Sequence, residues 1–432
     1  MTACGLDFGT SNTTLGVVRG DAPRLLALEG EDVTIPSAIF FEPAGRTTIG
    51  RAGIEAYVDG QPGRLMRSFK SVLGKPLLDE TTQVGRGRVT FREVIGRYLG
   101  AVKARAEGAL GRELTSVVHG RPVHFVEDDP EGDRKAEEAL REIASGVGFR
   151  EISFEYEPIA AALEYERSIS SEQIALIADV GGGTSDFSVV RIGQPLGRSS
   201  DRRGDILSND GIRVGGTDFD RLLSLNAVMP EMGFRSPTKR ADLAVPSSYF
   251  HDLATWSSIN RLYAPKVRRE IDEIRRDAAR PELIDRLKSV VNQERGHTLA
   301  MDVERAKIEL SELLETEVHL GWIEPGLSVC IGRTDLVSAT NILSERLHAR
   351  ALRCVRLAGV EPQDIDVLFL TGGSTRLPHA RAAIMSAVPS ACVVAGDTFG
   401  SVGLGLTIAA ARRYGAAILP RPAACQDAGS LP

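Results

Sequence analysis

The stretch Cys4–Val18, CGLDFGTSNTTLGVV, has a close relative further along the chain, ALIADVGGGTSDFSVV at Ala175–Val190. Each stretch runs from an apolar segment through an aspartate and a glycine turn with threonine and serine to a second apolar segment. The aspartates, Asp7 and Asp179, lie 179 − 7 = 172 residues apart. That distance is too long for a solenoid repeat and fits one half of a domain that has been duplicated.

Length and composition describe a globular protein. The 432 residues are enough for two to three domains, and the net charge of −6 provides no general basic field for nucleic acid. Five scattered cysteines without metal-ligand spacing indicate reduced, mostly buried thiols. We find no secretory signal, and no apolar run reaches the ~18–20 residues that span a bilayer. We therefore expect a cytoplasmic protein without nucleic-acid or membrane partners.

The order of predicted elements is the same in both halves of the chain, with mixed sheets flanked by helices in an α/β fold. Asp133 is expected to cap the helix that follows it. The predicted parts are lobe I (1–168) with an insertion (about 40–111), lobe II (171–395) with a helical insertion (about 228–320), a closing helix (397–415) that returns to lobe I, and a flexible tail (416–432).

The two glycine loops have the composition of phosphate-binding turns. Glycine allows a sharp turn and a close backbone approach, and successive N–H groups in such a turn form an anion-binding nest. Two facing nests would hold two sides of one polyphosphate, whereas a tight hairpin between strands is the structural alternative. The loop residues are Gly9, Thr10, Ser11 and Asn12 in the first loop, and Gly181, Gly182, Gly183 and Thr184 in the second.

An aspartate precedes each loop. A carboxylate beside a phosphate is repulsive unless a cation lies between them, so Asp7 and Asp179 predict Mg²⁺, held through waters because Mg²⁺ gives up its hydration reluctantly. Asp186 either joins this shell or only caps a turn.

The paired loops LDFGTSN and ADVGGGTSD resemble the two phosphate motifs of the actin-like ATPases, which include heat shock protein 70 (DnaK-type) chaperones, bacterial actin homologues and sugar kinases. The resemblance runs from about Gly5 to Tyr414. It implies a ribonuclease H-like, duplicated two-lobe fold with a nucleotide cleft between the lobes, and ATP or ADP with Mg²⁺ as ligands. Further stretches similar to the DnaK-type branch are KSVLG at Lys70, EPIAAALEYE at Glu157, VGGTDFD around Gly215 and Gly216, ERAKIELS at Glu304 and LTGGSTRLP at Leu370.

The resemblance assigns roles at the phosphate end of the cleft. The lysine matching Lys70 reaches the γ-phosphate, although a lysine in a basic loop is otherwise usually a solvated charge. Glu157 is implied to be an active-site carboxylate, and its structural alternative is an acid that favours the helix dipole. Thr184 and Asp179, together with Glu157, would hold the attacking water.

Other residues are implied at the ribose and base. Glu304, Lys307 and Ser311 share one helical face, which in the family meets the ribose and adenine; the alternative is an ordinary amphipathic helix. The loop of Gly372, Gly373 and Ser374 brings Arg376 to the base, over which its guanidinium can stack. Asp397 matches the acid that begins the closing helix, or simply caps it. The chain departs from the family at Ile308, where the DnaK-type branch usually has a second stacking arginine.

The implied function is a DnaK-type, ATP-hydrolysing switch with a chaperone-like or regulatory role. Unfolded polypeptide and a nucleotide-exchange factor are the implied protein partners. We recognise no β-rich peptide-binding domain after the closing helix, so only the ATPase is implied. Two alternatives remain: a filament-forming actin homologue, against which the charged insert Met229–Glu294 argues, and a small-molecule kinase, for which we find no clear catalytic aspartate.

Overall fold

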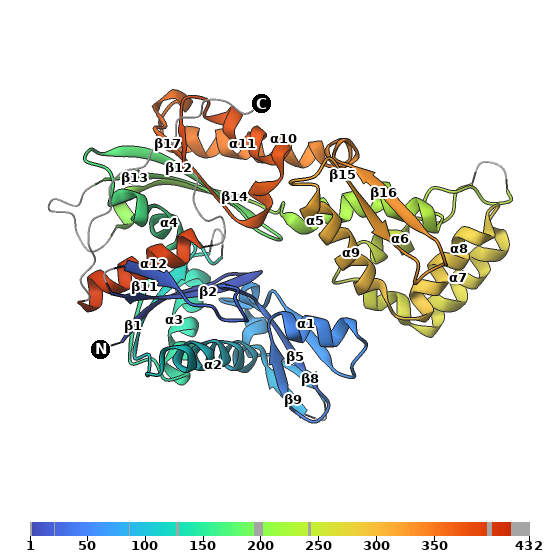
Figure 1. The fold of residues 1–432 in the computed structure, drawn as a ribbon, viewed down its shortest axis with the longest axis horizontal. Coiled ribbons are helices and arrows are strands. Elements are labelled where there is room, and N and C mark those ends of the chain that lie inside the picture. Colours follow the sequence, from blue (N-terminus) through green and yellow to red (C-terminus); the bar gives the residue numbers. More distant parts are fainter. Residues whose placement is uncertain are drawn as a thin grey trace.

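Two five-strand paths of matching connectivity form the centre of the molecule (Figure 1). The computed structural model describes residues 2–20, 22–85, 87–126, 129–193, 202–240, 243–394 and 400–415. The first path has the order β11-β10-β1-β2-β3, and β4 also pairs with β2. Its strands are β1 (Ala3–Phe8), β2 (Asn12–Arg19), β3 (Ala22–Leu25), β4 (Thr34–Pro36), β10 (Ser116–Arg121) and β11 (Glu151–Tyr156).

The second sheet repeats this plan in the order β14-β13-β12-β17-β18. In both sheets three consecutive strands pair antiparallel. A fourth strand pairs parallel with the first of these three, and a fifth pairs parallel with the fourth. The duplication expected from the paired loops is thus present in the connectivity. The strands are β12 (Gln173–Val180), β13 (Ser185–Ile192), β14 (Ile206–Ile212), β17 (Val367–Thr371) and β18 (Cys392–Val394).

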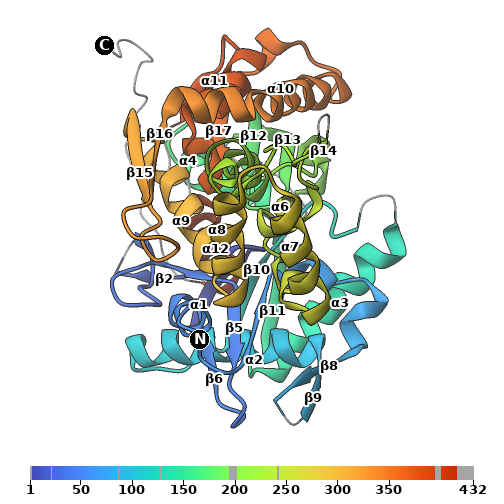
Figure 2. The ribbon, with the colours of Figure 1, turned by 90° about the vertical axis from the view of Figure 1, so that its right-hand side faces the viewer.

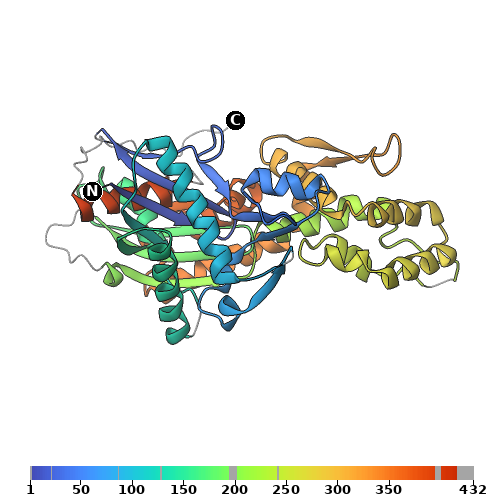
Figure 3. The ribbon, with the colours of Figure 1, turned by 90° about the horizontal axis from the view of Figure 1, so that it is seen from below.

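Helices complete a layered arrangement (Figures 1 and 3). The first sheet packs on α2 and α3, and the second on α10 and α11, in two separate apolar cores. Between the sheets lie α4 and α12, which share a third core with both. These two helices cross so closely that a Cβ on Gly405 would lie 1.8 Å from the Ala160 carbonyl oxygen. The helix bounds are α2 (Phe91–Leu110), α3 (Pro130–Gly146), α4 (Glu157–Glu166), α10 (Arg333–Leu357), α11 (Pro378–Ala387) and α12 (Ser401–Tyr414).

Each half carries an insertion at the same end of the molecule (Figure 2). The insertion of the first half contains α1 (Arg51–Val58), the sheet of β5 (Ala38–Phe41), β6 (Thr47–Ile49) and β7 (Arg64–Arg67), and the hairpin of β8 (Thr81–Val84) and β9 (Gly87–Thr90). The second half has α5 (Gly216–Leu223), α6 (Ser248–Leu253), α7 (Pro265–Asp277), α8 (Pro281–Asn292) and α9 (Gly296–Glu309), followed by the hairpin of β15 (Glu315–His319) and β16 (Ser328–Gly332). Within the described ranges, no helix combines the length and apolar character needed to cross a bilayer.

One local prediction was wrong. Asp133 does not cap α3, because the helix begins earlier, at Pro130, a residue favoured at the first helical position. Asp129 is the cap and accepts from the Gly132 N–H at 2.9 Å, while Asp133 accepts from Arg121 at 2.6 Å. The lobe bounds stay predictions, and Asp397 and residues 416–432 lie outside the described residues.

Candidate functional site

A cavity of about 1080 Å³ lies between the two halves, and the ends of β1 and β12 open into it. Gly215 is not on its wall, and Asp397 is outside the described residues. The other predicted site residues all line it: Asp7, Gly9, Thr10, Ser11, Asn12, Lys70, Glu157, Asp179, Gly181, Gly182, Gly183, Thr184, Asp186, Gly216, Glu304, Lys307, Ser311, Gly372, Gly373, Ser374 and Arg376. The structure brings them together, and their catalytic or binding roles remain predictions.

The two glycine loops are tight hairpins of the same construction. The Gly9 N–H donates to the Asn12 carbonyl at 2.9 Å, and the Gly181 N–H donates to the Thr184 carbonyl at 3.0 Å. The loops also meet, because a Cβ on Gly182 would lie 2.4 Å from Ser11 Oγ. The hairpin alternative is therefore correct as a description of shape, and it is compatible with ligand binding by the same loops.

Both loops present unused backbone donors. Within the described residues, no hydrogen bond is made by the N–H groups of Thr10, Ser11, Gly182, Gly183 and Thr184, which we call the free amides. In the second loop the carbonyls are held instead: Gly216 N–H donates to Gly181 at 2.9 Å and Thr217 N–H to Gly182 at 2.8 Å. Backbone amides that lack protein acceptors, next to carbonyls that already accept hydrogen bonds, are typical of an anion-binding turn.

Gly215 supports this second loop from behind. A Cβ at Gly215 would lie 2.5 Å from the Gly183 nitrogen, so a larger residue would displace the loop. Because Gly215 has no side chain, the start of α5 can approach the loop closely.

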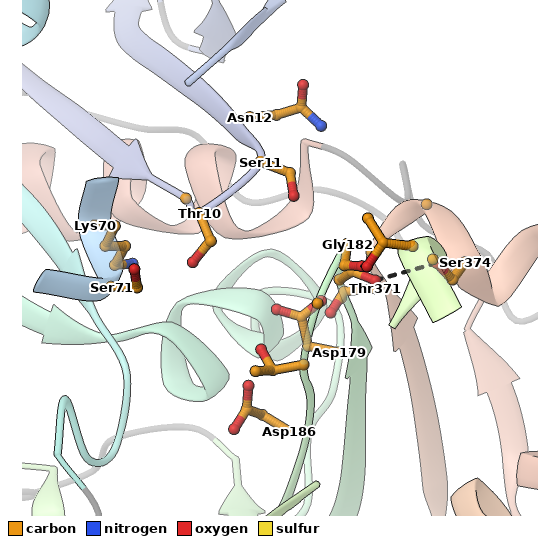
Figure 4. A pocket seen from close by; sticks show the side chains of 18 of the residues that line it. Thr10, Ser11, Asn12, Lys70, Ser71, Asp179, Gly182, Asp186, Thr371 and Ser374 are labelled. Carbon is orange, nitrogen blue, oxygen red and sulfur yellow. Dashed lines mark hydrogen bonds between the residues drawn. The ribbon is translucent and has the colours of Figure 1, made fainter. Parts of the chain in front are cut away.

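Carboxylates and one lysine gather below the loops. Figure 4 shows Lys70 and Thr10 on one side of this space and Asp179 and Asp186 on the other. Lys70 Nζ donates to Glu157 Oε1 at 2.7 Å, and the Lys70 side chain is 9% exposed. Burial alone would lower the pKa of Lys70, but the carboxylates of Glu157 and Asp7 outweigh it and raise this pKa.

Burial and the charge of Glu157 raise the pKa of Asp7 to about 7 and that of Asp179 to about 6. Negative charge thus exceeds positive charge here. Such an excess of hard oxygen donors fits Mg²⁺. Among the described residues no group of three or more His, Cys, Asp or Glu side chains is placed to hold a metal directly.

At the opposite end of the cavity, α9 and the loop after β17 supply other side chains. Lys307 pairs with Asp220 at 2.8 Å, and Arg376 pairs with Glu312 at 2.8 Å. Ile308 also lines the cavity and is 56% exposed. Among the described cavity residues of α9 and the β17 loop, Arg376 is the only arginine. This agrees with the isoleucine at position 308, where the DnaK-type branch usually has a second arginine.

Comparison with known proteins agrees with this architecture. The family model described as Hsp70 protein matches residues 3–231 and 270–408. This chain belongs to the Hsp70 family. It therefore has the actin-like ATPase fold of that family. It is also similar to the chaperone protein DnaK of Akkermansia muciniphila, with 26% identity over 403 residues, which cover 87% of this chain and 53% of that protein. The chain thus matches about half the length of this relative.

Sequence reasoning overlooked several residues in this Hsp70-family cavity. Asp220 stands in the VGGTDFD motif, from which only the glycines were taken, and it provides the partner of Lys307. Arg67 and Lys75 flank the stretch around Lys70, and Thr371 precedes the Gly372 turn. Asp220 and Thr371 stand in or beside recognised motifs, so their positions in the cavity could have been predicted from the sequence. The position of Arg67 could not, because it depends on how β7 packs.

Proposed function

We propose that this chain is a Mg²⁺-dependent ATPase of the Hsp70 type, in which ATP bridges the two halves and favours their closure. The observation that carries the proposal is the set of free amides, which belong to residues of both loops that line one cavity. A polyphosphate would supply acceptors to both loops at once. Because these contacts form together only when the halves approach, the bound nucleotide would favour the closed arrangement.

The residues below the loops suit phosphoryl transfer to water. This reaction depends on charge neutralisation and on an aligned nucleophile more than on covalent chemistry. Lys70 would neutralise the developing charge, and Glu157, Asp179 and Thr184 would orient the attacking water. Mg²⁺, held through waters by Asp7 and Asp179, would supply further neutralisation when bound.

The direct test is ATP hydrolysis by the full chain. We expect slow turnover with Mg²⁺ and none when a chelator removes the metal, measured as released phosphate. The same assay with a reduced, unfolded polypeptide tests the chaperone-like role, because faster turnover would show coupling to a client. Hydrolysis that persists in the chelator would contradict the proposed chemistry.

Ile308→Arg is expected to strengthen ATP and ADP binding. The new guanidinium would face the base opposite Arg376, and a cation–π contact of about 0.5–2 kcal/mol corresponds to roughly 2–30-fold in affinity. Titration calorimetry would measure the change. Ile342→Arg is the matched control, since Ile342 is equally exposed at 57% and lies outside the cavity. Equal affinity of Ile308→Arg and wild type would contradict stacking at this face.

A further inference from the structure

Arg67 at the end of β7 enters the cavity from the insertion of the first half. Its guanidinium stacks over the Trp256 ring, with 4.7 Å from Cζ to the ring centroid. Within the described residues this guanidinium makes no hydrogen bond and no ion pair. A guanidinium has five N–H donors in its plane, and stacking on one face leaves all of them available.

The surroundings of Arg67 point to a particular ligand. Burial lowers the pKa of Arg67, and this effect outweighs the nearby carboxylates of Glu304 and Asp220, which raise it. Asp220 is already paired with Lys307 at 2.8 Å, but Glu304 has no hydrogen bond or ion pair within the described residues. The cavity therefore contains, at one end, an unused cationic donor and an unused anionic acceptor.

Such a pair suits hydroxyl groups better than phosphate. The Glu304 carboxylate would repel a phosphate, whereas a hydroxyl both donates and accepts and so satisfies the two side chains together. The phosphate end of the cavity already has its own donors, the free amides and Lys70. A ribose diol is the hydroxyl-bearing part of a nucleotide whose phosphates lie there.

We propose that Arg67 is a nucleotide-contacting residue that donates to the ribose hydroxyls, next to Glu304, which the family resemblance already implies at the ribose, and that Arg67 makes the site prefer ribonucleotides to 2′-deoxyribonucleotides. The inference rests on the proposed function. It adds a specificity-determining contact from the insertion of the first half, on the side of the cavity opposite α9.

The platform below Arg67 is built by both halves. Trp256 packs edge-on against His297, with ring centroids 4.6 Å apart, and the Trp256 carbonyl lies 3.2 Å from His297 Nε2. Tyr57 of α1 reaches across to His297 Nδ1 at 3.3 Å. Trp256 falls between the two ranges matched by the Hsp70 model, whereas Tyr57 and His297, which support it, lie within them.

The test compares ATP and 2′-dATP affinities by calorimetry for the full chain and three variants. We expect wild type to prefer ATP on the order of 10-fold, as for one charged hydrogen bond. Arg67→Gln should lose about this factor for ATP and little for dATP, so that most of the preference is lost. Arg67→Lys should restore part of it. The control is Arg64→Gln on the same strand, where Arg64 is exposed and donates to the Gln83 carbonyl; it should keep the wild-type preference.

A second variant keeps the proposal falsifiable if Arg67→Gln does not fold. Trp256→Leu retains Arg67 but removes its stacking surface, and we expect a reduced ATP preference. Equal losses for both nucleotides in Arg67→Gln, or an unchanged preference in Trp256→Leu when Arg67→Gln is unfolded, would overturn the role of Arg67. Failure of wild type to bind either nucleotide would instead overturn the proposed function, and the inference with it.

Discussion

Lys70→Ala is expected to slow ATP hydrolysis on the order of 10²-fold or more, while ATP still binds. The substitution removes the cation that contacts Glu157, at 2.7 Å, in a cavity region that also holds Asp7 and Asp179. A preorganised charge of this kind acts mainly on the transition state, so turnover should fall far more than affinity. Phosphate release under saturating Mg-ATP measures turnover, and calorimetry measures binding.

Lys266→Ala provides the control for Lys70→Ala. Lys266 is also a lysine, but its side chain is 81% exposed on α7, and it does not line the cavity. The control should hydrolyse ATP like wild type. If Lys70→Ala did so too, the assignment of Lys70 to the phosphate end would be wrong.

The local pattern of glycine residues made the shape of the two glycine loops predictable. The spacing of Asp, glycine and threonine places both loops after a strand, and matched hairpins then follow with the same internal hydrogen bond. The helix start near Asp133 was missed for a related reason, since two aspartates compete for the cap and Pro130 decides between them. Where the residues that determine a local structure are neighbours in sequence, that structure can be predicted from the sequence alone.

Tertiary packing was not predictable in the same way. Arg67 and Trp256 are 189 residues apart (256 − 67 = 189), and only the packing of one insertion against the other brings them together. Lys307 illustrates a subtler case: its cavity position was expected, but its ion pair with Asp220 at 2.8 Å was not. Because of that pair, Lys307 would approach a ligand already partly neutralised. Within the described part of the chain, Glu304 and Arg67 have no ion-pair partner at this end.

Asp179→Asn is expected to have opposite effects on the empty and the liganded protein. Burial and the charge of Glu157 raise the pKa of Asp179 to about 6, from about 4 in the unfolded chain. Between these values the folded state holds a proton that the unfolded state has released. The free energy of unfolding therefore falls as pH rises from about 4 to about 6, and the cost, up to roughly 3 kcal/mol, is fully present above pH 6.

Asparagine resembles the neutral acid and removes this cost, so at pH 7.5 the empty variant should melt a few degrees above wild type, whereas at pH 4 the two should be alike.

Bound Mg-ATP should reverse this order of stability. Saturating ligand at ~1,000 times its dissociation constant stabilises the wild type by roughly 4 kcal/mol, but a variant that holds the metal poorly gains much less. Thermal melts with and without Mg-ATP at both pH values measure these effects. Asp59→Asn, on an exposed aspartate after α1, should change neither. A variant that is no more stable than wild type when empty, and equally stabilised by Mg-ATP, would mean that Asp179 is only a turn residue, because a buried charge that serves a cation must cost stability when that cation is absent.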